Sequence, residues 1–278
     1  MDWLLDPLSY DFMRQALLAS FLVGILCPVV GTYLIVQRMA MLGDVVAHGV
    51  LPGLAIASFL NLPVLLGAFT CGLFSTFVIT WIRTQSRIKA DTAMAITFST
   101  FFSLGITLLT VLRSRVSLEQ LLFGDILSIR SSDVWQIAAI AGLVLVGVGL
   151  FYKELLFFTF DPLGAEALGL PVNRINLGLM AGITLAIIAG IKTVGVILVV
   201  ALMVGPAATA YLLVKELHWM MALGATLGVL FSVVGMYSSY YLDIPSGPAI
   251  GLTVFAGFLL ALLFSPYQGL LTRRLENI

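Results

Sequence analysis

The feature that most constrains this chain is the recurrence of apolar segments about as long as a bilayer is thick. A membrane-spanning helix needs roughly 20 mostly apolar residues. Such segments make up most of the 278 residues, of which 60% are hydrophobic and 10% charged. A soluble domain carries about 25% charged residues. We therefore expect an all-α, polytopic bundle of transmembrane helices, and no water-soluble core.

The apolar segments predict about nine spans, and eight or ten spans are the alternatives. Each can satisfy its backbone hydrogen bonds internally as a helix, which lipid requires. The predicted spans cover residues 15–36, 41–60, 63–82, 91–112, 133–152, 174–190, 194–213, 218–241 and 247–265. We expect them to form a single transmembrane domain over 1–278.

The distribution of charge predicts how the spans are oriented. Arg83, Arg87 and Lys89 lie together between the third and fourth spans, so this loop is expected in the cytoplasm by the positive-inside rule. Alternation then places nine basic residues inside and five outside. The N-terminus is expected outside, and residues 2–12 are an alternative interfacial segment.

Composition also excludes some classes of function. Fourteen basic residues balance fourteen acidic ones, so nothing points to nucleic acid as a partner. The sequence contains no G-x-x-x-x-G-K-[ST], H-E-x-x-H or G-x-S-x-G motif. We therefore expect no enzyme and no permanently bound cofactor in this chain. Cys27 and Cys71 lie within apolar segments and are interpreted as buried hydrophobic side chains.

One pair of ionisable residues, Asp44 and His48, lies inside a predicted span. Ionisable residues in a membrane helix are costly and so are functional candidates. Four residues apart on a helix, the two side chains share a face. A carboxylate and an imidazole suit Mn²⁺, Fe²⁺ or Zn²⁺, while an Asp–His hydrogen bond to a neighbouring helix is the structural alternative. A two-fold dimer would bring four ligands together.

A short helix is predicted within the loop at 153–173. Asp161 can cap its N-terminus, Pro162 suits its first position, and Gly169 can end it. From these residues alone, an ordinary helical connector is as good an interpretation as a functional element.

The segment Gly43–Gly53 resembles the permeases of bacterial metal-ion ABC importers, which carry manganese, zinc or iron. A G-D-x-x-x-H stretch in an early membrane helix is typical of that family. Further similarity lies in four other segments: Leu122–Leu127, Asp161–Gly169, Val194–Ala210 and Leu242–Pro248. Together these segments are spread over most of the chain.

This resemblance implies roles for particular residues. Asp44 and His48 would bind the ion in transit. The segment within 161–170 would be the coupling helix that docks on the ATPase, with Asp161, Gly164, Ala165, Glu166 and Gly169 as its characteristic residues. Asp125 and Asp243 would lie in outer loops that contact a binding protein.

The resemblance also implies an assembly and a cargo. The assembly would contain a second copy of this chain, a cytoplasmic ATP-binding subunit and an extracytoplasmic metal-binding protein, in a bacterial plasma membrane. The Val50–Gly53 continuation resembles the manganese and iron branch, so we expect Mn²⁺, with zinc or iron as the alternative. A secondary metal transporter is the competing class, and it would usually need further charges within the membrane.

Overall fold

The computed structural model describes residues 7–112, 124, 129–266 and 269, and these residues form helices joined by short turns. Nine of their helical segments are long and apolar enough to cross a membrane. The spans are α2 (Asp11–Val36), α3 with α4 (Met41–Gly49 and Leu51–Phe59), α5 (Val64–Gln85), α6 (Ala90–Val111), α8 (Ser131–Leu150), α11 (Val172–Val194), α12 (Val196–Leu213), α13 (Leu217–Leu242) and α14 (Ser246–Phe264). The predicted all-α membrane bundle is confirmed.

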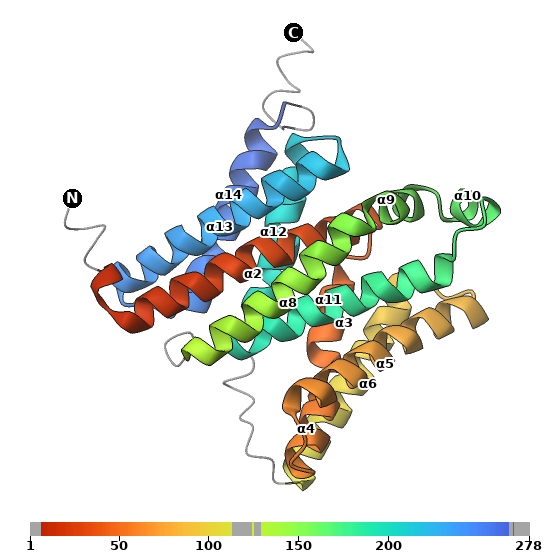
Figure 1. The fold of residues 1–278 in the computed structure, drawn as a ribbon, viewed down its shortest axis with the longest axis horizontal. Helices are drawn as coiled ribbons and strands as arrows, with labels where there is room; N and C mark the ends of the chain where they lie inside the picture. Colours follow the sequence, from red (N-terminus) through yellow and green to blue (C-terminus); the bar gives the residue numbers. More distant parts are fainter. Residues whose placement is uncertain (1–6, 113–123, 125–128, 267–268, 270–278) are drawn as a thin grey trace.

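The first span forms the centre of the bundle. In its most apolar stretch α2 has 72% of its residues buried, whereas α8 has 22%. Figure 1 shows α2 between α13 on one side and α8 on the other. Glycines allow the closest approach, because a Cβ on Gly24 would lie 3.0 Å from the Gly228 carbonyl oxygen of α13. Small residues commonly permit such contacts between membrane helices.

The second span is broken, where the sequence predicted one helix over 41–60. Its two halves, α3 and α4, meet at Val50. Pro52 has no N–H to donate to the carbonyl of His48, the residue four positions earlier. The break therefore lies directly beside the predicted ion ligand.

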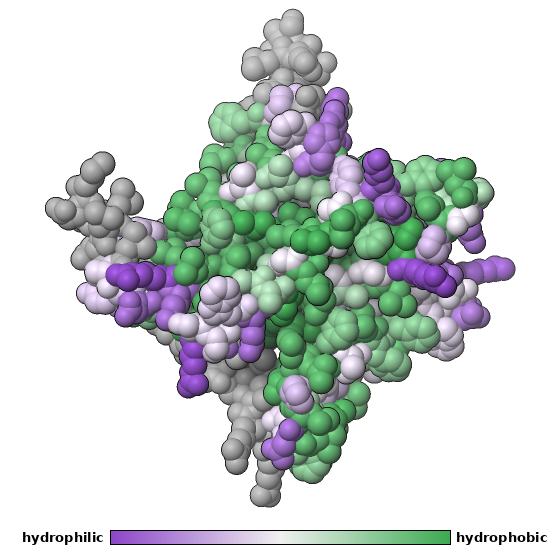
Figure 2. Space-filling view, in the orientation of Figure 1, coloured by the Kyte–Doolittle hydropathy of each residue, from purple (hydrophilic) through white to green (hydrophobic). Residues whose placement is uncertain are grey.

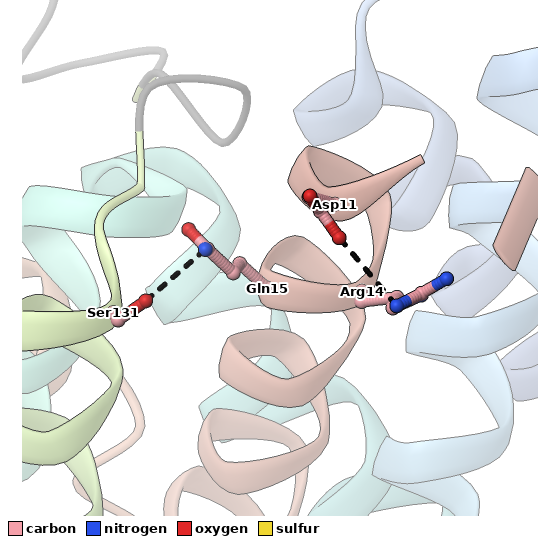
Figure 3. A network of polar contacts seen from close by, with 4 residues as sticks. All are labelled: Asp11, Arg14, Gln15 and Ser131. Carbon is pink, nitrogen blue, oxygen red and sulfur yellow. Dashed lines mark hydrogen bonds and ion pairs between the residues drawn. The ribbon is translucent and has the colours of Figure 1, made fainter. Parts of the chain in front are cut away.

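Hydrogen bonds join loops that alternation placed on the same side of the membrane. At one end, Gln15 of α2 donates to Ser131 Oγ of α8 at 3.1 Å, and Arg14 pairs with Asp11 at 3.5 Å (Figure 3). At the other end, Gln37 Nε2 donates to Thr159 Oγ1 at 3.4 Å. Figure 2 shows a broad apolar surface between polar groups at these two ends. This grouping agrees with the predicted alternation.

The loop expected at 153–173 contains two helices. They are α9 (Tyr152–Phe160) and α10 (Pro162–Ala167), and both lie at the same end of the bundle (Figure 1). The sequence predicted α10 and missed α9, which nearly continues α8. A short 3-10 helix, η1 (Pro7–Ser9), precedes α2. Cys27 and Cys71 are both free thiols.

Candidate metal-ion and coupling sites

Asp44 and His48 lie on one face of α3, as their spacing predicted. His48 Nε2 is 3.4 Å from Asp44 Oδ1, and the side chains are 12% and 42% exposed respectively. Metal–ligand bonds of about 2.0–2.2 Å place neighbouring ligand atoms about 3–3.5 Å apart. The observed separation is thus compatible with both atoms contacting one ion, and it is longer than a typical hydrogen bond.

The imidazole of His48 is held by two aromatic rings of α6. The rings of Phe98 and Phe102 stand at 90° and 87° to it, with centroids 4.9 and 5.1 Å away. The two phenyl rings stack on each other. Edge contacts of this kind restrict the orientation of the imidazole. The sequence alone did not indicate these two residues, because their four-residue spacing on α6 also suits ordinary packing against lipid or protein.

The two ring nitrogens of His48 have different surroundings. The buried Nδ1 atom has no hydrogen-bond partner among the described residues. A histidine that binds metal usually donates its second ring N–H to a carboxylate or carbonyl. Here Asp44 lies beside Nε2, so Nε2 is the nitrogen positioned to face an ion.

Glycines in the neighbouring helices allow close packing around the break. A Cβ on Gly49 would lie 2.7 Å from Ser75 Oγ of α5. On the other side, a Cβ on Gly105 of α6 would lie 2.5 Å from the Leu51 Cβ. The α3–α4 span is therefore held between α5 and α6, with no space for larger residues at these points.

The described residues supply two ligands and no larger group. They contain no cluster of three or more His, Cys, Asp or Glu side chains able to hold a metal ion. As metal ligands, Asp44 and His48 would form only part of a coordination set. Such a set binds an ion weakly unless water or a second molecule completes it.

The second candidate site is α10, whose ends have the predicted capping interactions. Asp161 Oδ1 accepts a hydrogen bond of 2.9 Å from the Gly164 N–H. At the other end Gly169 has φ +79°. The Gly169 N–H donates to the Glu166 carbonyl at 2.9 Å, and the Leu170 N–H donates to the Ala165 carbonyl at 3.0 Å. This pair of bonds is a Schellman motif.

The surface of α10 is more apolar than the predicted residues suggested. Ala165 is fully buried on its inner side, and Glu166 is exposed. The sequence analysis missed Leu163 and Leu168, which are 79% and 74% exposed. Two exposed leucines in a helical segment outside the spans are suited to contact another protein. Their presence in a capped surface helix was the signal that could have identified them.

Of the two predicted outer residues, only Asp243 is among the described residues. Asp243 is exposed at the end of α13 in the left-handed conformation, with φ 54°. The nearby Ser239 Oγ donates to the Ile244 carbonyl at 2.6 Å, which fixes the turn into α14. Asp125 lies outside the described residues. No described contact brings Asp243 near Asp44 or His48.

Comparison with known proteins agrees with this architecture. The model of the ABC 3 transport family matches residues 9–265. The chain is 43% identical over 271 residues to the manganese transport system membrane protein MntC of Listeria monocytogenes, covering 98% of this chain and 97% of that protein. It is 39% identical over 281 residues, and over 100% of both chains, to a Haemophilus influenzae protein described as a "Probable iron transport system membrane protein".

A solved structure has the same fold. It is PsaBC from Streptococcus pneumoniae in complex with Fab, with a TM-score of 0.89 and 36% sequence identity. The match covers 99% of this chain and 98% of that chain. The chain therefore belongs to the ABC 3 transport family and is a multi-pass bacterial membrane protein of the ABC permease type, the class that its motifs resemble.

Proposed function

We propose that this chain is the permease of an ATP-driven importer of Mn²⁺, acting as one membrane domain over 1–278. The observation that carries the proposal is the Asp44–His48 pair, whose facing atoms are 3.4 Å apart on a broken membrane helix. An oxygen and a nitrogen ligand without sulfur are compatible with manganese. The similarity to MntC supports this choice of ion.

A second copy of the chain would complete the ion site. One chain supplies two side-chain ligands, and two-fold symmetry doubles that number. The Asp44 side chain is 42% exposed, which leaves it accessible to a partner. A transport site also needs to release its ion, so a small ligand set on each side of a shared axis suits the function.

ATP hydrolysis would take place in a separate cytoplasmic subunit that docks on α10. The exposed Leu163 and Leu168 provide an apolar contact, and the two capped ends keep the helix intact as it transmits movement. On the outer side, an extracytoplasmic binding protein would deliver the ion near Asp243 and Asp125. The chain itself then has no enzymatic role.

Uptake of radiolabelled Mn²⁺ tests the ion and the site together. Cells that express this chain with its ATPase and binding protein should accumulate Mn²⁺ in an ATP-dependent way, with little effect of excess Zn²⁺. Asp44→Ala should abolish uptake while the complex still assembles. Asp11→Ala is the matched control, because that exposed carboxylate lies at the outer end of α2. Normal uptake by Asp44→Ala would refute the site.

Iron is the second candidate cargo, and one observation favours it. The Haemophilus influenzae relative is described as part of an iron transport system. Uptake of Fe²⁺ in place of Mn²⁺ in the same cells would establish iron as the cargo. Accumulation of Zn²⁺ instead would establish zinc as the cargo. Uptake that persists when the ATPase is inactivated would instead indicate a secondary transporter.

A further inference from the structure

An apolar groove of about 620 Å³ lies between α8, α9 and α11. Its lining runs from Leu143 to Leu155 on α8 and α9 and from Leu185 to Arg174 on α11, and it includes Val30 of α2. The two charged residues are at one end, beside the turn from α10 into α11. The remainder of the lining is almost entirely hydrocarbon. Helices α8 and α11 lie next to one another, with α9 and α10 at one end of the pair (Figure 1).

The groove is as long as one leaflet of a bilayer. On α11 the lining covers twelve residues, from Arg174 to Leu185, and their eleven rises of about 1.5 Å each span about 16 Å. The hydrocarbon core of a membrane is about 30 Å thick, so the groove extends from the headgroup level to near the midplane. Its length and its apolar lining match a lipid acyl chain.

Two glycines face the open space of the groove. Gly147 of α8 and Gly178 of α11 both line it. A Cβ at either position would meet no other atom within 4 Å. Both positions thus face open space, and a larger residue at either one could occupy the groove without a clash inside the protein.

The mouth of the groove carries one positive and one negative group. Arg174 is exposed and Glu154 is half-buried, and no ion pair joins the two among the described residues. A guanidinium binds phosphate strongly. A carboxylate beside it favours a ligand that also carries an ammonium group and disfavours one that is purely anionic. The two charges together complement a zwitterionic headgroup, which carries one negative and one positive group.

We propose that this groove binds one phospholipid with a phosphoethanolamine headgroup. An acyl chain lies between α8 and α11, the phosphate contacts Arg174, and the ammonium contacts Glu154. The lipid belongs to the cytoplasmic leaflet, an assignment that rests on the proposed docking of α10 to a cytoplasmic ATPase. Leu170 and Pro171, which join α10 to α11, also line the mouth. The bound lipid therefore packs under the segment that connects α10 to its span.

Native mass spectrometry of the purified permease–ATPase complex tests this binding directly. The probes are phosphatidylethanolamine, phosphatidylglycerol and phosphatidylcholine with identical acyl chains. We expect about tenfold stronger retention of phosphatidylethanolamine, since one charge-assisted hydrogen bond contributes about that factor. Phosphatidylglycerol lacks the ammonium, and the quaternary ammonium of phosphatidylcholine has no N–H to donate. Equal retention of the three lipids would overturn the proposal.

Variants separate the groove from general contact with lipid. Gly178→Leu should reduce retention of all three lipids, and Gly147→Leu provides a second variant if the first does not fold. Gly149→Leu is the matched control, because Gly149 also faces open space and does not line the groove. Glu154→Gln should remove the preference for phosphatidylethanolamine, whereas Arg174→Gln should weaken all three. Identical behaviour of the leucine variants at positions 178 and 149 would contradict the assignment.

A second copy of the chain is the competing occupant. In a chain whose Cys27 and Cys71 are replaced by alanine, Gly178→Cys should give no cross-link between two permeases. A specific cross-link at this position would show that protein covers the groove and would overturn the proposal. Neither lipid retention nor cross-linking depends on transport of Mn²⁺. A failure of the lipid proposal can therefore be distinguished from a failure of the proposed transport function.

Discussion

The backbones of Gly53 in α4 and Gly67 in α5 are in direct contact. A methyl group on either residue would overlap the carbonyl oxygen of the other. The half-helix that follows the break is thereby held against its neighbour by main-chain packing. This contact fixes where α4 lies relative to α3, and so it helps to position the face that carries Asp44 and His48.

Gly53→Ala should therefore destabilise the protein. Forcing one extra carbon into a tightly packed contact typically costs about 1–3 kcal/mol, and here the obstacle is backbone, which gives way less easily than a side chain. We expect a lower unfolding temperature of the purified permease and reduced transport. Gly149→Ala is the control, since that position is open. Equal unfolding temperatures for both variants would contradict the packing argument.

Phe98→Ala and Phe102→Ala should weaken ion uptake by several-fold. Each phenyl edge contact contributes about 0.5–1.5 kcal/mol, and its removal lets the His48 ring rotate away from Asp44. The loss should be smaller than that in His48→Ala, because the ligand itself remains. Initial rates of Mn²⁺ uptake over a range of concentrations measure the effect.

The control for those phenylalanine variants is Phe77→Ala. Phe77 is 61% exposed on α5 and has no contact with His48. If Phe98→Ala and Phe102→Ala transport Mn²⁺ at the rate of this control, the aromatic rings do not position the histidine.

Asp161→Ala should weaken the association with the ATPase subunit. The substitution removes the side-chain hydrogen bond to the Gly164 N–H, and loss of such a cap costs about 0.5–2 kcal/mol. The first turn of α10 should then fray and misplace Leu163. Co-purification of the ATPase with a tagged permease measures the association. Asp161→Asn keeps a capping oxygen and should restore binding, and equal losses in the two variants would argue against a capping role.

Replacing both exposed leucines tests the docking surface itself. The double variant Leu163→Ser and Leu168→Ser leaves the cap and the Schellman motif intact. We expect normal accumulation of the permease with a large loss of ATPase binding, because buried apolar area is removed from the interface. Leu177→Ser in α11, a residue 63% exposed, is the comparison. Full retention of the ATPase by the double variant would exclude α10 as the principal contact.

Labelling of single cysteines tests the orientation of the bundle. Leu62→Cys, in the turn between α4 and α5, should react with a membrane-impermeant maleimide added to intact cells. Gln85→Cys, at the end of α5, should react only after the membrane is permeabilised. Both side chains are exposed, so accessibility from each side of the membrane decides the result. The reverse pattern would invert the orientation predicted from the basic residues.

The sequence by itself determined the spans, their alternation and the type of family. Apolar segments of bilayer length have one stable solution in lipid, a helix with its own hydrogen bonds satisfied, so the nine predicted spans correspond to those observed. The spacing of Asp44 and His48 put them on one face because helix geometry is local. The caps of α10 were predictable for the same reason, since Asp161, Pro162 and Gly169 act on their own backbone.

Only the tertiary structure decided which surfaces meet. The break at Val50 needed more than Pro52, because a proline in a membrane helix can be accommodated by a kink alone. The rings around His48 come from a different helix, and the exposure of Leu163 and Leu168 depends on how α10 lies against α9 and α11. The groove between α8 and α11 is likewise lined by glycines on two helices, at positions 147 and 178, about 30 residues apart in the sequence. Such contacts join residues of different helices. The spacing of residues along the sequence does not show which helices pack together.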